Sequence, residues 1–230
     1  RRYKFKIRGF LKVNNYGIDI WSDDNFVIED GLAKINYDCK PSLISIVKDI
    51  RKQDFKGPLL LRFPHITEKQ VNTLYNTFNS SIKEYDYKGT FNAVFPLKVN
   101  QLPNFIHPLI NEGKKFNYGL EAGSKAELVI AMTYNNVGSP ITVNGFKDKE
   151  MIHLGFIAKS MGHNITIIIE GLNELEIIIE VLNETKMECP NIGLRVRLHS
   201  GGSGLWAKSG GINSKFGLTS TEILEAYELM

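Results

Sequence analysis

The sequence has few cysteines, little net charge and no long apolar run. Its two cysteines, Cys39 and Cys189, are too few for a disulfide framework and lack the spacing of a zinc site. The 28 Lys and Arg residues nearly balance the 25 Asp and Glu residues, so a net charge of +3 gives no argument for nucleic acid or an anionic membrane. The longest apolar stretches, 165–169 and 177–179, are far shorter than the roughly 18 residues of a membrane helix. The first residues also lack the apolar core of a signal peptide. These absences favour a globular protein of the cytoplasm.

Apolar strands alternate with amphipathic helices over most of the chain. Stretches 17–21, 26–29 and 32–36, separated by turn residues, predict small antiparallel strands. Further strands are expected at 59–63, 91–97, 116–120, 141–143, 165–169 and 192–198. Helices alternate with these strands, among them helices expected at 43–50 and 172–185. This alternation indicates an α/β fold with a parallel sheet. About six βα units fit, fewer than the eight of a closed barrel. Periodicity alone equally allows a doubly wound open sheet.

The two ends of the sequence suggest a piece of a longer protein. The first residue is Arg, and the last predicted helix runs from the capping box at 219–222 to Met230 with no residue that would end it. We divide the chain into an amino-terminal β segment, residues 1–38, and an incomplete β/α barrel, residues 39–230.

Lys98 lies at the end of the predicted strand 91–97. Active sites of α/β folds lie at the carboxyl ends of their strands. Partial removal from water would favour the neutral amine that forms a covalent link to an aldehyde. The alternative is an ordinary solvated lysine, and the residues alone favour that alternative.

Three further charged residues lie at strand ends. Glu121 precedes the predicted capping residue Ser124, a position that suits either an anion-binding site or simple helix-end electrostatics. Arg195 and Arg197 are two residues apart, which predicts that both point to one face of a strand. Such cations need anionic partners, either a carboxylate or phosphate ligand or acidic residues of neighbouring strands.

The glycine-rich loop 201–211 follows the two arginines. It contains five glycines in eleven residues and matches a loose dinucleotide-binding pattern, but no helix begins where that pattern requires one. We therefore reject that interpretation and expect a loop that closes over a ligand, or a mobile connection. The five histidines, His199 included, show no metal-ligand spacing.

Several motifs together resemble the biosynthetic arginine decarboxylases. The segment Val94-Phe-Pro-Leu-Lys-Val-Asn-Gln101 is similar to the cofactor-lysine strand of that family, and residues 118–128 resemble its next strand. Similar motifs follow in the family's order at 144–148, 194–198, 202–204, 209–211 and 214–218, and earlier ones lie at 16–21 and 60–64. The lysine strand alone would indicate only the wider fold III pyridoxal phosphate group.

The resemblance implies an alanine-racemase-like barrel joined to a β-domain, with pyridoxal 5′-phosphate linked covalently to Lys98. It also implies decarboxylation of L-arginine to agmatine and CO2 in polyamine synthesis. The family requires Mg²⁺, for which the sequence shows no ligand set. Its active site is completed by a second subunit, so we expect a homo-oligomer and an inactive isolated chain that binds the cofactor poorly.

The resemblance also assigns roles to individual residues. Glu121 replaces an aspartate that related ornithine enzymes hold close to the cofactor, and one of the two arginines corresponds to their strand arginine. The local alignment does not decide between them, and we favour Arg197. Lys215 matches a lysine at the dimer contact of those relatives. His199 does not correspond to the family's ring-stacking histidine.

Two alternatives remain open at this point. One is another fold III decarboxylase, acting on diaminopimelate, ornithine or carboxynorspermidine, although the long insert before Lys98 argues against these shorter relatives. The other is a catalytically inactive homologue with a regulatory role, which the retention of Lys98, Glu121 and the arginines argues against.

Overall fold

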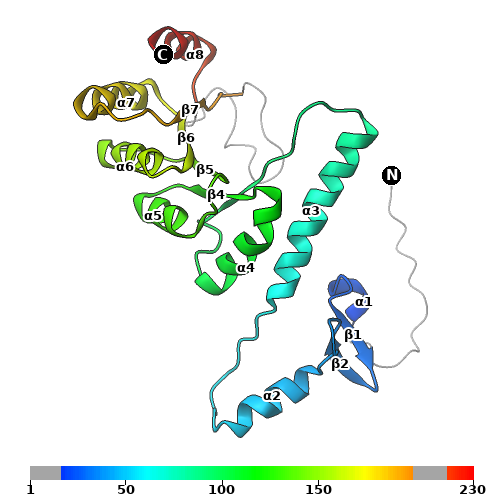
Figure 1. Ribbon diagram of the computed structural model, residues 1–230. Coiled ribbons are helices and arrows are strands. Elements are labelled where there is room, and N and C mark those ends of the chain that lie inside the picture. The colour runs from blue at the N-terminus through cyan, green and yellow to red at the C-terminus, as the bar shows by residue number, and fades with distance from the viewer. Residues whose placement is uncertain (1–16, 199–216) are drawn as a thin grey trace. The chain divides into compact units, whose positions relative to one another are not determined.

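The computed structural model describes residues 17–198 and 217–230 and divides the chain into two compact units, Arg1–Phe63 and Pro64–Met230. The first unit contains α1 (Ile18–Trp21), β1 (Phe26–Glu29), β2 (Leu32–Ile35) and α2 (Leu43–Lys52) (Figure 1). The predicted hairpin is confirmed, because β1 and β2 pair antiparallel with Glu29 opposite Leu32. Asp30 and Gly31 make its turn with φ angles of 55° and 71°, the left-handed conformation that two-residue hairpin turns favour.

Two short strands predicted in this unit are wrong. Residues 18–21 form helix α1 instead, which the Ser22 amide closes by donating to the Ile18 carbonyl at 2.9 Å. Residues 59–63 pair with no strand of the described chain, and Leu60 is 75% exposed. Prolines at both ends of this stretch lack the amide N–H that a sheet ladder uses. Short apolar runs alone therefore did not specify a strand.

Helix α2 is confirmed and belongs to the same compact unit as the hairpin. Ser42 caps it by accepting a hydrogen bond from the Ser45 amide at 3.1 Å. Since α2 packs on β2, the compact unit extends past residue 38. The division at residue 38 concerns the domains of the whole protein, and it stays a prediction.

The second unit consists of a parallel sheet and its helices. Its strands are β3 (Val94–Pro96), β4 (Gly119–Ala122), β5 (Pro140–Val143), β6 (Asn164–Ile169) and β7 (Asn191–Leu194). Its helices are α3 (Pro64–Glu84), α4 (Pro103–Gly113), the 3₁₀ turn η1 (Lys114–Phe116), α5 (Lys125–Tyr134), α6 (Lys149–Ser160), α7 (Leu172–Thr185) and α8 (Ser220–Leu229). Figure 1 shows α5, α6 and α7 side by side along β4 to β7. No helix in the described residues is both long and apolar enough to cross a bilayer.

The order of the strands separates the two architectures that periodicity left open. The sheet runs β3-β4-β5-β6-β7, so every strand pairs in parallel with the next one in the chain. A doubly wound sheet would reverse direction at a switch point, whereas a β/α barrel adds each strand at the same edge. Residue Val196 continues the series through a parallel bridge to Leu218. The second unit is therefore part of a β/α barrel, as expected.

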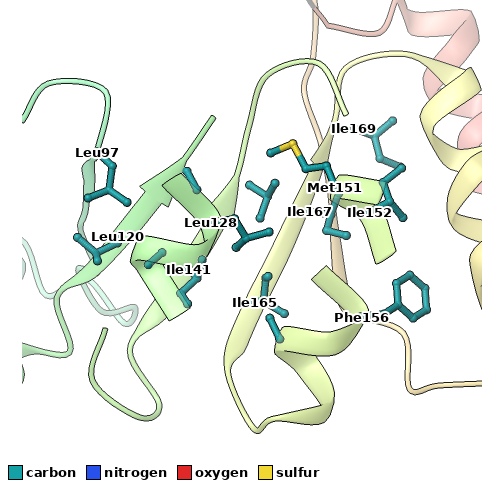
Figure 2. Close-up of a cluster of buried hydrophobic side chains, with 14 of the residues drawn as sticks. Leu97, Leu120, Leu128, Ile141, Met151, Ile152, Phe156, Ile165, Ile167 and Ile169 are labelled. Carbon is teal, nitrogen blue, oxygen red and sulfur yellow. The ribbon is translucent and has the colours of Figure 1, made fainter. Parts of the chain in front are cut away.

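The two faces of the sheet differ in chemistry. Leu120, Ile141, Ile165, Ile167 and Ile169 are buried under the helices, where they pack with α5 and α6 residues such as Leu128, Ile152 and Phe156 (Figure 2). Because strand side chains alternate, Glu121, Thr142 and Ile168 face the opposite side, which is the concave interior of a barrel.

Two strand boundaries differ from the prediction at positions that matter for the site. Strand β4 begins at Gly119 rather than at 116, because Asn117 takes a left-handed φ of 60° after η1. Glu121 therefore lies within the strand instead of following it. Strand β7 ends at Leu194, so Arg195 and Arg197 lie just beyond it.

Candidate functional site

An open cavity of about 760 Å³ lies at the carboxyl ends of the strands, on the face that Glu121, Thr142 and Ile168 line. Three of the residues predicted from the sequence meet there: Lys98, Glu121 and Arg195. The remaining lining residues are Val94, Gly123, Thr142, Asn144, Gly145, Ile168 and Glu170. Each of the strands β3 to β7, or the loop that follows it, thus contributes to one cavity.

Lys98 follows β3 in a tight turn. The Val99 amide donates to the Pro96 carbonyl at 3.0 Å, and the Leu97 amide donates to the Glu121 carbonyl of β4 at 3.0 Å. These bonds fix the backbone on both sides of Lys98, while its side chain is exposed. The partial desolvation expected for this amine is therefore not present in the described chain, because the cavity is open to solvent.

Glu121 and Thr142 present polar groups from the middle of the sheet. The two residues are register partners on β4 and β5, and both line the cavity. Within the described residues the Glu121 carboxylate forms no ion pair. The Thr142 hydroxyl oxygen is buried and has no hydrogen-bond partner there. Since buried hydroxyls are normally bonded, this oxygen is available to a group bound in the cavity.

The two arginines, Arg195 and Arg197, occupy different surroundings. Arg195 lines the cavity, and its Nη1 lies 2.8 Å from Oε1 of Glu170, the residue that follows β6. This is the pairing with a neighbouring strand that we considered as the alternative to a ligand. Arg197 does not line the cavity, and its Nε donates to the Gly217 carbonyl at 3.1 Å. The spacing of two predicted a shared face, but the strand ends before either arginine. The geometry favours Arg195 over Arg197 as the arginine of the site.

Sequence reasoning missed three buried charged residues behind the cavity: Glu127, Lys147 and Glu174. Glu127 accepts hydrogen bonds from the Gly123 amide at 2.7 Å and from the Gln101 side chain at 2.9 Å. Glu174 accepts from the Glu170 amide at 2.8 Å and pairs with Lys147 at 3.0 Å. Both glutamates lie in the first turn of a helix, which was the one available signal, but their side-chain partners Gln101 and Lys147 are distant in sequence.

Helix α6 begins beside this region with a charged cap. Asp148 accepts from the Met151 amide at 2.9 Å and pairs with Lys125 at 2.8 Å. The hydrogen bond from Lys125, and then that from the Met151 amide, lower the pKa of Asp148. The cap therefore stays ionised at neutral pH and suits the amino end of the helix.

Some expectations fall outside the described residues. These are Lys215, His199 and the glycine-rich loop 201–211. In the part of the chain that the structure describes, no three His, Cys, Asp or Glu side chains are grouped as a metal ion would require. The expected Mg²⁺ stays a prediction about the whole protein.

Comparison with known families agrees with this geometry. The profile described as "Pyridoxal-dependent decarboxylase, pyridoxal binding domain" matches residues 68–230. Since the match covers most of the chain, this chain belongs to the pyridoxal-dependent decarboxylase family, and the matched region is its pyridoxal binding domain.

Individual relatives narrow the resemblance. The biosynthetic arginine decarboxylase of Bacteroides thetaiotaomicron is 39% identical over 220 residues, which is 94% of this chain and 35% of that protein. The corresponding protein of Prochlorococcus marinus (strain AS9601) is 38% identical over 218 residues, or 92% of this chain and 34% of that one. The chain therefore spans about a third of the length of these relatives.

Solved structures give the same result. The crystal structure of the biosynthetic arginine decarboxylase from Campylobacter jejuni matches with 58% identity and a TM-score of 0.85, over 94% of this chain and 34% of that one. A diaminopimelate decarboxylase from M. jannaschi matches with 24% identity and a TM-score of 0.66, over 90% of this chain and 45% of that one. The second likeness supports the fold alone.

Proposed function

We propose that this chain supplies the cofactor-lysine part of a biosynthetic arginine decarboxylase, which converts L-arginine to agmatine and CO2 for polyamine synthesis. The observation that carries the proposal is the meeting of Lys98, Glu121 and Arg195 in one cavity of a pyridoxal binding domain. The substrate follows from the arginine decarboxylases that match 92–94% of the chain.

The groups in the cavity fit pyridoxal phosphate. An amine, a carboxylate, a guanidinium and a buried hydroxyl that has no partner among the described residues face one space. The amine complements an aldehyde, and the guanidinium and the hydroxyl complement anionic oxygens. Bound there, the cofactor supplies an electron sink that stabilises the carbanion left by loss of a carboxylate.

The chain's own residues have separate tasks in this proposal. Lys98 would provide the amine that holds the cofactor covalently in the cavity. Glu121 holds a carboxylate in the cavity, where it would lie close to the bound cofactor, as the resemblance implies. Glu170 fixes the Arg195 guanidinium at the cavity wall, where its positive charge would attract a bound anion.

The remaining family features are part of the same proposal. We expect Mg²⁺ to be required, a second subunit to complete the site with Lys215 at the contact, and the protein to reside in the cytoplasm. The exposure of Lys98 supports the need for further protein to cover the cavity. Accordingly, we expect the isolated 230-residue chain to be inactive and to bind pyridoxal phosphate poorly.

Product analysis of the full-length protein tests the proposal. With pyridoxal phosphate and Mg²⁺ present, L-arginine should yield agmatine, detected by liquid chromatography. The Lys98→Ala variant should yield none, whereas Lys52→Ala, which removes an exposed lysine of α2 that pairs with Asp49, should retain activity. Release of lysine from diaminopimelate, or of putrescine from ornithine, without agmatine would contradict the assignment and indicate another fold III decarboxylase.

A further inference from the structure

A buried ion pair lies directly behind the cavity. Lys147 is 0% exposed and Glu174 is 2% exposed, and the ammonium Nζ lies 3.0 Å from Oε2 of Glu174. Lys147 is in the loop after β5 and Glu174 is in the first turn of α7, after β6. A buried pair of charges is costly, and apolar residues of similar size often stabilise a protein as well or better. Stability alone therefore does not account for this pair.

The pair is joined by hydrogen bonds to the groups that line the cavity. Glu174 accepts from the backbone amides of Lys147 at 3.1 Å and Glu170 at 2.8 Å. The Lys147 ammonium also donates to the Gly145 carbonyl. The Gly145 amide in turn donates to Oε1 of Glu170 at 3.3 Å. The same carboxylate oxygen accepts from Arg195 at 2.8 Å. A continuous series of contacts therefore leads from the buried ion pair to Arg195 in the cavity.

We propose that Lys147 and Glu174 are positioning residues, which fix Glu170 and through it Arg195 in the orientation that cofactor binding requires. The inference rests on the proposed function, since it assigns the cavity to pyridoxal phosphate. Gly145 supports it: this residue takes a φ of 76°, and a Cβ there would lie 3.0 Å from the Gly123 carbonyl. The loop that Lys147 holds is thus closely fitted between two others at the cavity wall.

The positioning role differs from simple cohesion of the helices. Helices α6 and α7 are already joined at the surface, where Lys149 pairs with Glu180 at 2.8 Å and with Glu184 at 2.7 Å. Unlike these surface pairs, the buried pair contacts the loops that carry Gly145 and Glu170. Displacement of a site group by about 1 Å can lower function by about a hundredfold, so tethering of this kind has a direct effect on binding.

The test uses the full-length protein and measures its affinity for pyridoxal phosphate by absorbance titration. The Lys147→Met variant should bind the cofactor about tenfold more weakly or worse. The matched control is Lys149→Met. It removes an ammonium that pairs with α7 at the surface and does not contact the loops of the cavity wall. Its affinity should equal that of the wild type. Equal affinity in Lys147→Met would overturn the inference.

A second variant covers the case in which Lys147→Met unfolds. In the double variant Lys147→Met, Glu174→Gln the charges are removed together, so the protein should regain most of its thermal stability. The Gly145 tether is still missing, so weak cofactor binding should persist. Normal binding by a stable double variant would show that the pair acts through stability alone and would overturn the inference.

A double-mutant cycle tests whether Lys147 acts on Arg195 through Glu170. In a Glu170→Gln background, where the link to Arg195 is already weakened, Lys147→Met should reduce cofactor affinity little further. Fully additive losses would contradict the route through Glu170. If the wild-type protein itself bound no pyridoxal phosphate, the proposed function would fail together with this inference. Binding by the wild type with no effect of Lys147→Met would refute this inference only.

Discussion

Two buried glutamates, Glu127 of α5 and Glu174 of α7, occupy equivalent places in two βα units of the barrel but have partners of different charge. Each lies in the first turn of the helix after its strand and accepts a hydrogen bond from the amide four residues earlier. Each also bonds to the loop that follows the neighbouring strand: the loop after β3 for Glu127 and the loop after β5 for Glu174. Glu127 does so through the neutral amide of Gln101, and Glu174 does so through Lys147, whose ammonium is fully buried.

The partner of each buried glutamate should decide how much stability the protein loses when that glutamate is neutralised. If Glu127 loses its charge, a rotated Gln101 amide can still find a hydrogen-bond partner. If Glu174 loses its charge, the Lys147 ammonium stays buried without a counter-ion. The consequences for stability should therefore differ, although the two carboxylates are equally hard to see in the sequence.

The largest effect is expected for Glu174→Gln. Removing one partner of a buried ion pair lowers the free energy of unfolding by about 3–5 kcal/mol. Urea denaturation of the full-length protein, followed by circular dichroism, would measure it. The exposed pair provides the control, since Lys149→Met should cost less than about 1 kcal/mol. A loss below about 1 kcal/mol for Glu174→Gln would show that the buried ammonium tolerates neutralisation.

A smaller effect is expected for Glu127→Gln. The substitution keeps one carbonyl acceptor for the Gly123 amide and exchanges the contact with Gln101 for an amide–amide hydrogen bond, so we expect a loss of about 1 kcal/mol. The same denaturation series measures it beside Glu174→Gln. If the two variants were equally destabilised, the identity of the partner would not set the cost, and the comparison would fail.

Much of the architecture could be predicted because it depends on local patterns. Helix α7 (Leu172–Thr185) matches its predicted bounds, and the capping box that opens α8 is present, with Thr219 and Glu222 bonded reciprocally. Strand β6 follows from a continuous apolar run. Where a run was short, as at 17–21 and 59–63, the same reasoning failed, because a few apolar residues do not specify a pairing partner.

The site was predictable only in part, and for a physical reason. Lys98, Glu121 and Arg195 could be found because strand ends of a parallel sheet meet at one edge. Thr142 and Glu170 gave no local signal, and the burial of Lys147 depends on a glutamate 27 residues away. The shared face predicted for Arg195 and Arg197 relied on regular strand spacing, but the strand ends at Leu194, before either of them. Long-range pairing and exact strand ends therefore decide what sequence reasoning misses.

The most direct test of the account is to locate the lysine that carries the cofactor. The full-length protein, loaded with pyridoxal phosphate, would be reduced with borohydride, digested and analysed by mass spectrometry. The account predicts that the reduced cofactor is attached to Lys98 and is absent from the Lys98→Ala variant. Attachment to the buried Lys147 or to any other lysine, or no attachment at all, would contradict it.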